Sequence, residues 1–157
     1  MNAVLRPAAI FYHRECVADV LEEIKPLLMD HYREIAHYQD IALDPDYDFY
    51  KASQERGLLR IFTARADDRL IGYAIYFVAR SHKYRSSIQA TQDILFLHPD
   101  YRRGGTGYRL IEFADSQLRS EGVQVVIQHV KAIHDFGSLL TRMGYELQDL
   151  YYTRRLD

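Results

Sequence analysis

The glycine-rich segment 101–107 reads Tyr-Arg-Arg-Gly-Gly-Thr-Gly, and its residue types and spacing suit the binding of an anion. Glycine has no Cβ, so it permits positive φ and lets backbone N–H groups approach a ligand closely. A helix that begins at such a turn adds its own N-terminal N–H groups, which attract negative charge. Arg102, Arg103 and Arg109 supply positive charge that can reach phosphate oxygens.

Taken by itself, this segment predicts either an anion site or only a tight connection between two elements. It is not a Walker loop, because no lysine follows the glycines in the required G-x-x-x-x-G-K-[ST] spacing, and it is not a G-x-G-x-x-G fingerprint. The choice between the two interpretations therefore depends on the elements that surround the segment.

The residues on both sides of the segment predict a strand before it and a helix after it. The strand is expected over about 88–97, polar in its first half and apolar in its second, and Pro99 stops it. The helix is expected over about 105–120 because its apolar residues recur at helical spacing. Its apolar face contains Leu110, Ile111, Ala114 and Leu118.

The N-terminal part predicts a short strand near 8–12 and a helix whose apolar stripe covers 20–38. Pro26 lies inside this stripe, so we expect a kink or a break into two helices near Lys25. A second helix is expected from Asp46, as its N-cap, to Gly57.

The remaining segments predict four further elements. Residues 59–64 and 70–79 read as a β-hairpin, and residues 123–130, apolar on both faces, read as a central strand. A short helix is expected over 135–144, and a last β segment over 145–155. The order of these elements predicts an α/β (α+β) fold with one mixed sheet.

Composition and charge limit the class of protein to which this chain can belong. The 157 residues carry no internal repeat or linker, so we expect one domain over 1–157. No apolar stretch reaches the roughly 20 residues that span a bilayer, and the single Cys16 suits a reducing compartment, so we expect a cytoplasmic protein with no membrane partner.

The charge is divided unevenly between the two parts of the chain. Residues 1–57 carry 6 Lys/Arg against 11 Asp/Glu, whereas residues 58–157 carry 14 against 11. The first part suits a cationic acceptor and the second an anionic cofactor, unless the acidic helix surfaces serve only solubility. No basic stripe with interleaved aromatic residues predicts nucleic-acid binding, and no cluster has the spacing of metal ligands.

The segment 95–107, which reads LFLHPDYRRGGTG, resembles the acetyl-CoA-binding signature of the GCN5-related N-acetyltransferase (GNAT) superfamily. Arg102, Gly105 and Gly107 occupy the three signature positions, and the order of elements is similar over nearly the whole chain. The resemblance implies a GNAT-like domain with a mixed, mostly antiparallel central sheet flanked by helices. It also implies an N-acyltransferase that uses acetyl-CoA (coenzyme A) and transfers the acetyl group to a primary amine by direct attack in a ternary complex.

The resemblance further implies which residues contact the cofactor. Backbone N–H groups near Leu95 and Leu97 are expected to bind the pantetheine amides and the thioester oxygen, as an oxyanion-type contribution, although both side chains also suit the core. The expected cofactor-binding residues are Leu95, Phe96, Leu97, Arg102, Arg103, Gly104, Gly105, Thr106, Gly107 and Tyr108. Direct attack needs no covalent nucleophile, so Cys16 is expected to be structural or incidental.

The acceptor amine must lose a proton before it attacks. A lysine-like amine is only about one part in a thousand neutral at pH 7.4, which costs roughly 4 kcal/mol. Asp93, two residues before Leu95 and at a place where many relatives carry a carboxylate, is the first candidate for the general base, directly or through water. The alternative is that Asp93 only ends the polar half of its strand.

The sequence departs from the family pattern where many relatives carry an Asn and a proton-donating Tyr. Those places hold Ile133 and Leu140, and neither can donate a proton. His134 and Tyr145 are the neighbouring candidates, with capping or packing as their alternative roles. Water is the other proton source, and a weakly active or inactive module that binds CoA or a protein is the alternative function.

The acceptor is expected to be an amine of a small molecule, a protein lysine or a protein N-terminus, and a homodimer is left open. The four tyrosines of the acceptor-side helices can line an amine pocket through cation–π contacts, or can simply pack. They are Tyr32, Tyr38, Tyr47 and Tyr50.

Overall fold

The computed structural model describes residues 8–157, which form five strands, four α-helices and two short 3-10 helices. The strands are β1 (Ile10–Glu15), β2 (Leu59–Ala66), β3 (Arg69–Arg80), β4 (Ile88–Leu97) and β5 (Val125–Ile127). The helices are α1 (Val17–Ile35), α2 (Tyr47–Glu55), η1 (Pro99–Tyr101), α3 (Thr106–Ser120), η2 (Ala132–His134) and α4 (Gly137–Arg142).

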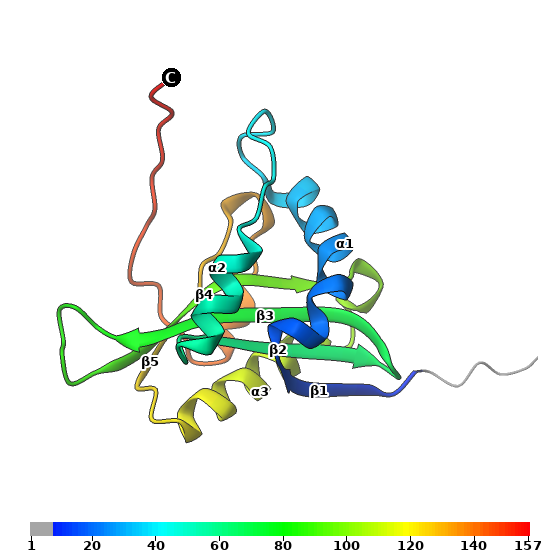
Figure 1. Ribbon diagram of the computed structural model, residues 1–157, viewed down its shortest axis with the longest axis horizontal. Helices are drawn as coiled ribbons and strands as arrows, with labels where there is room; N and C mark the ends of the chain where they lie inside the picture. Colours follow the sequence, from blue (N-terminus) through cyan, green and yellow to red (C-terminus); the bar gives the residue numbers. More distant parts are fainter. Residues whose placement is uncertain (1–7) are drawn as a thin grey trace, which may run out of the picture.

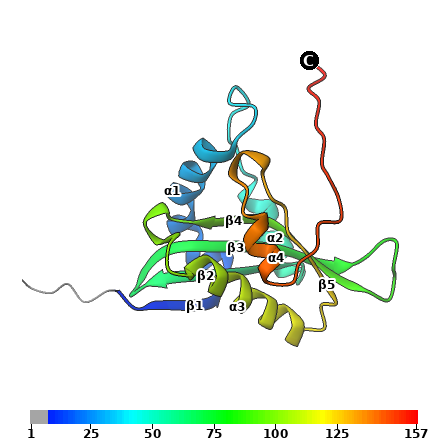
Figure 2. The same ribbon diagram turned by 180° about the vertical axis from the view of Figure 1, so that it is seen from behind.

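The strands form one sheet in the order β1-β2-β3-β4-β5. The first four are antiparallel neighbours, while β5 runs parallel to β4. Helices α1 and α3 lie on opposite sides of the sheet (Figure 1), and Figure 2 shows the same arrangement from behind. The mixed, mostly antiparallel sheet flanked by helices is therefore confirmed.

Side chains alternate along the strands and divide the core into two layers. One layer joins α3 to the sheet and includes Leu110, Ala114, Leu118, Phe62 and Tyr76. The other joins α1 to the opposite face and includes Val20, Ile24, Leu28, Tyr73 and Phe96. The two layers pack on opposite faces of the sheet and so hold β4, the strand that carries part of the predicted site, in place.

Most of the predicted boundaries agree with the structure. The predicted strand 88–97 is β4, and the helix predicted over 105–120 is α3, which begins one residue later. Helix α2 begins where the Asp46 carboxylate accepts a hydrogen bond from the Phe49 N–H at 2.9 Å, and it ends before Gly57, whose φ is +73°.

The break that was one of two outcomes expected at Pro26 does not occur, because α1 continues through this proline as one helix. Proline removes only one helical hydrogen bond, whereas the buried side chains of Ile24 and Leu28, on either side of it, fasten both parts of the helix to the sheet. Tertiary packing therefore outweighs the local penalty. None of the helices within residues 8–157 is both long and apolar enough to cross a membrane.

The prediction of a central strand over 123–130 is wrong. The strand β5 has three residues and lies at the edge of the sheet, where Val125 and Ile127 are 40% and 37% exposed. The cause is geometric, because β5 pairs only with the first part of β4. Burial on both sides, which an all-apolar strand predicts, requires a further neighbour that the described chain does not provide.

The last β segment predicted over 145–155 is also absent. No strand follows α4, and the chain runs away from the sheet to its C-terminus (Figure 1). The large apolar residues Leu147, Leu150, Tyr151 and Tyr152 of this segment are exposed. A β pattern becomes a strand only when it finds a partner edge, and this segment pairs with none within residues 8–157.

Candidate active site

The second half of β4 has one edge without a strand partner. Strand β4 pairs with β3 along its length, but with β5 only over Gln89–Thr91. The His98 N–H donates to Ile71 O toward β3, so the alternation of an antiparallel ladder turns the backbone groups of Leu95 and Leu97 the other way. The backbone groups of Leu95 and the N–H of Leu97 can therefore bind an extended amide-bearing ligand, whereas the Leu97 carbonyl accepts a hydrogen bond from Arg102.

A β-bulge lies at Asp93, just before the part of β4 whose edge is open. Gln92 lies opposite Tyr76 and Ile94 lies opposite Ile75, so Asp93 is the additional residue on β4. The bulge places Asp93 on the face covered by α1 and α2, where the Tyr50 hydroxyl donates to its Oδ2 atom at 2.6 Å. Burial and the nearby Asp93 carboxylate raise the pKa of Tyr50, which keeps it protonated as a donor.

The chain leaves β4 through η1 and enters α3 through two glycines with positive φ. The values are +88° at Gly104 and +82° at Gly105, a region that side chains with a Cβ rarely adopt. The first helical hydrogen bond of α3 runs from the Arg109 N–H to Gly105 O at 3.0 Å. The N–H groups of the first turn, at residues 106–108, therefore remain available for an anion.

The start of α3 lies against the end of β4. A Cβ added to Gly107 would come 3.6 Å from Leu97 Cδ2, and the hydroxyl of Tyr12 donates to the carbonyl of buried Thr106 at 3.4 Å. Tyr108, by contrast, is exposed. The structure thus brings the open edge of β4 and the N-terminus of α3 together, in the order that a pantetheine followed by a pyrophosphate requires.

The three arginines of this region take different positions. Arg102 donates two hydrogen bonds to the Glu34 carboxylate, at 2.9 and 2.7 Å, and one to Leu97 O at 2.8 Å. It therefore links the loop to α1. Arg103 and Arg109 are exposed at the start of α3, and only Arg109 contacts the loop, at Gly104 O (3.4 Å).

His31 packs beside this link. Its ring lies 5.3 Å from the ring of Phe96, which is buried on β4, and burial lowers the pKa of His31 to about 4. The nearby Glu34 opposes this shift, whereas Arg102 supports it. His31 and Glu34 did not stand out in the sequence, although their spacing of three places both on one helix face.

The two further catalytic candidates lie in different surroundings. Tyr145 donates to the Asp115 carboxylate on α3 at 2.7 and 2.8 Å, and Gln128 donates to the Tyr145 oxygen at 3.3 Å. Burial and Asp115 raise the pKa of Tyr145, which makes the phenol a weaker acid. His134 is exposed at the end of η2.

The two positions that depart from the family pattern lie in different environments. Ile133 is 74% exposed and Leu140 is buried. Neither supplies a donor. Asp115 and Gln128, which hold Tyr145, gave no sequence signal because their partners come from distant parts of the chain.

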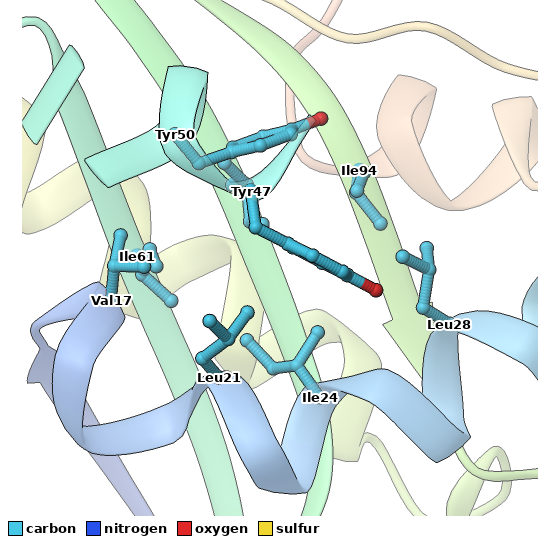
Figure 3. Close-up of a pocket in the computed structure, with 9 residues that line it drawn as sticks. Val17, Leu21, Ile24, Leu28, Tyr47, Tyr50, Ile61 and Ile94 are labelled. Atoms are coloured by element: carbon cyan, nitrogen blue, oxygen red, sulfur yellow. The ribbon is translucent and has the colours of Figure 1, made fainter. Parts of the chain in front are cut away.

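A small apolar cavity of about 20 Å³, enough for about one water molecule, lies between α1, α2 and the sheet, on the same face as the Asp93 carboxylate (Figure 3). Two of the four predicted tyrosines line it, Tyr47 and Tyr50. Tyr32 instead donates to Ile41 O, and Tyr38 packs beside His37 and Arg155. The other lining residues are Val17, Leu21, Ile24, Leu28, Ile61, Ile75 and Ile94.

The sheet, the opening beside the second half of β4 and the glycine loop at the start of α3 are features of the GNAT acetyltransferase fold. The sequence model of the Acetyltransferase (GNAT) family matches residues 21–144. The match covers most of the chain, so the chain belongs to this family. A search of curated proteins found no match.

Solved structures share this fold. An aminoglycoside acetyltransferase, meta-AAC0020, from an uncultured soil metagenomic sample in complex with sisomicin has a TM-score of 0.73 and 15% identity, covering 94% of this chain and 97% of its own. A ribosomal-protein-alanine N-acetyltransferase from Brucella melitensis biovar Abortus 2308 has a TM-score of 0.71 and 17% identity, and the match covers 95% of this chain and 100% of that one. A predicted acetyltransferase with acetyl-CoA from Clostridium acetobutylicum has a TM-score of 0.70 and 10% identity, and the match covers 94% of this chain and 96% of that one. Identities this low establish the fold alone.

Proposed function

We propose that this protein is an N-acetyltransferase that uses acetyl-CoA and acetylates a primary amine by direct attack in a ternary complex. The observation that carries the proposal is the open edge of β4, which leads into the glycine-rich start of α3 and bears Asp93 on the same strand. Family membership and the neighbour with acetyl-CoA support the same donor.

The residues present fit this donor. The backbone groups of Leu95 and the N–H of Leu97 point into the opening and match the amides of pantetheine, and the first turn of α3 matches a pyrophosphate. Gly104 and Gly105 leave open space where side chains would stand, and Arg103 and Arg109 add positive charge beside them. When bound, acetyl-CoA supplies a thioester whose acyl carbon an amine can attack.

Asp93 is the general base in this proposal. It accepts the proton that the ammonium of the acceptor must lose, directly or through one water. The hydrogen bond from Tyr50 holds Oδ2 of the carboxylate and leaves Oδ1 for the amine. The N–H groups of β4 stabilise the negative charge that develops on the acyl oxygen.

The departing thiolate needs a proton from another source. Tyr145 is held by Asp115, and its raised pKa disfavours proton donation. Water therefore supplies this proton in our proposal, with exposed His134 as the other candidate.

Calorimetry with acetyl-CoA, followed by thiol release over a panel of primary amines, tests the proposal. We expect saturable binding and amine-dependent release of the CoA thiol. Absence of binding at millimolar acetyl-CoA would refute the donor assignment.

A CoA-binding module without turnover is the second candidate. The observation that favours it is the placement of Ile133 and Leu140, which leaves the positions of the family's Asn and Tyr without a donor. Binding of acetyl-CoA without thiol release for any amine would select this alternative.

A further inference from the structure

The ladder between β4 and β5 stops at one point, and a side chain then joins the two segments. The last pair of residues in the ladder is Thr91 and Ile127. Two residues beyond the end of β5, the backbone N–H of His129 donates to Oε1 of Gln92 at 2.8 Å. The side chain of Gln92, and not a main-chain carbonyl, therefore bridges the two segments where they separate.

This bridge is buried and held from the neighbouring strand. Gln92 is 5% exposed and lies opposite Tyr76 of β3, whose side chain belongs to the core layer under α3. Gln128, which precedes His129, donates from Nε2 to the Tyr76 hydroxyl at 2.8 Å. Displacing Gln92 would break its bond with His129 and leave a buried amide without this partner, which is costly. The bridge is therefore a fixed part of the opening beside β4.

The proposed function brings the acyl end of the donor to this bridge. With the pyrophosphate at α3, next to Leu97, the pantetheine arm runs back along β4 toward Asp93. The strand spans about 16 Å from Leu97 to Gln92 at its usual rise. An extended arm of about thirteen bonds from phosphate to sulfur covers a similar length. The thioester then lies beside Asp93, where the proposed base requires it, and the carbons of the acyl group face Gln92.

Little room remains for a longer acyl chain beyond this thioester. On the side of α3, Gln92 and Tyr76 are both packed into the buried core. On the side of α1 and α2, the cavity beside Ile94 has a volume of about 20 Å³, enough for about one water molecule. Both sides therefore favour the shortest acyl group.

We infer that Gln92 closes the inner end of the opening beside β4 and makes the protein selective for acetyl-CoA over donors with longer acyl chains. The inference rests on the proposed function and specifies the donor. Gln92 takes part in no bond change: the amine forms its bond to the acyl carbon, the carbon–sulfur bond breaks, and Asp93 takes the proton of the amine. Gln92 only limits the length of the acyl group.

The test measures kcat/KM for acetyl-CoA, propionyl-CoA and butyryl-CoA with one amine that the protein acetylates. We expect kcat/KM to fall with each added carbon, and acetyl-CoA to be preferred over butyryl-CoA by at least about tenfold. Equal values of kcat/KM for the three donors would overturn the inference.

Gln92→Ala opens the inner end of the site, and a matched control is available on the same strand. The kcat/KM for butyryl-CoA should rise, and the preference for acetyl-CoA should fall by at least about tenfold. A gain with the longer donor cannot result from a loss of folding. Gln89→Ala removes the same type of side chain where β4 still pairs with β5, so it should leave the preference unchanged. Equal effects of the two substitutions would contradict the assignment of Gln92.

Gln92→Glu distinguishes the length of the side chain from the amide itself. Glutamate has the same length and retains an acceptor for the His129 N–H, so the preference for acetyl-CoA should stay within about threefold of that of the unaltered protein. A loss of preference as large as that of Gln92→Ala would show that the length of this side chain does not close the site.

Calorimetry separates the inference from the function on which it rests. CoA has no acyl group, so it should bind the unaltered protein and Gln92→Ala with equal affinity, whereas butyryl-CoA should bind Gln92→Ala more tightly. Binding of acetyl-CoA without thiol release for any amine would refute the proposed transfer, and the affinities of the two donors would still test the role of Gln92. Transfer with equal efficiency from acetyl-CoA and butyryl-CoA would refute the inference and keep the function.

Discussion

In the function that we propose, the donor side and the acceptor side of the site recognise their ligands by different means. On the donor side, the edge of β4 and the first turn of α3 offer backbone N–H groups, and glycines keep the approach open. On the acceptor side, side chains replace backbone groups, because the Tyr50 hydroxyl of α2 holds the Asp93 carboxylate of β4. Backbone recognition requires glycine at fixed places, whereas side-chain recognition tolerates many combinations of residues. The first leaves a pattern in the sequence and the second does not.

The largest effect is expected at Asp93, where the two sides meet. Asp93→Asn retains an acceptor for the Tyr50 hydroxyl but removes the base, so turnover should fall by about 10³-fold. The acid limb of the pH–rate profile should disappear with it, while affinity for acetyl-CoA stays unchanged. Steady-state kinetics and calorimetry measure both quantities.

Asp100→Asn is the matched control, since Asp100 lies in η1 with a side chain that is 81% exposed. Turnover of Asp93→Asn within twofold of the unaltered protein, with the acid limb intact, would exclude Asp93 as the base.

A bulkier residue at Gly107 tests the donor side. A Cβ at this position makes only an ordinary contact with Leu97, so Gly107→Ala should fold and bind acetyl-CoA. Gly107→Val places two further carbons at the N-terminal turn of α3, which should weaken acetyl-CoA affinity by about thirtyfold, or about 2 kcal/mol. Equal calorimetric affinities for the alanine and valine variants would show that the ligand does not approach this turn.

The contrast between the two sides explains how much the sequence could predict. Segment 101–107 lies between a strand and a helix as predicted, because proline, glycine and helical periodicity act locally. Three contacts instead depend on residues distant in the chain: that of Tyr50 with Asp93, that of Arg102 with Glu34 and that of Tyr145 with Asp115. The strand predicted over 145–155 is absent for the same reason, because a strand requires a partner edge that its own sequence cannot supply.

The contact between His31 and Phe96 joins α1 to β4 and gives the protein a predicted pH dependence. The pKa of His31 is lowered to about 4 by burial, so the unfolded state binds more protons between that value and about 6.5. Its contribution to stability is complete above about pH 6.5 and is lost as the pH falls toward 4. Allowing for the screening of a half-buried ring, we expect a loss of about 2 kcal/mol.

Urea unfolding at pH 7 and pH 4.5 measures this contribution. The groups that face His31 are Glu34, Arg102, Lys131 and His134. His31→Gln should reduce the difference in unfolding free energy between the two pH values, whereas His37→Gln, at an exposed position two residues beyond the end of α1, should retain it. The same difference in both variants would show that His31 titrates normally.

The smallest effect is expected at Glu34, where the separation of donor and acceptor sides is incomplete. Glu34 belongs to α1 and holds Arg102 of the donor loop through two hydrogen bonds, so Glu34→Gln should lower stability by about 1 kcal/mol. It should also raise KM for acetyl-CoA by about threefold to fivefold, because the loop loses its fixed position. Glu22→Gln, which removes only an exposed ion pair within α1, should change neither quantity. A stability loss with unchanged KM would mean that Arg102 holds α1 in place without positioning the donor loop, and the two sides would then act independently.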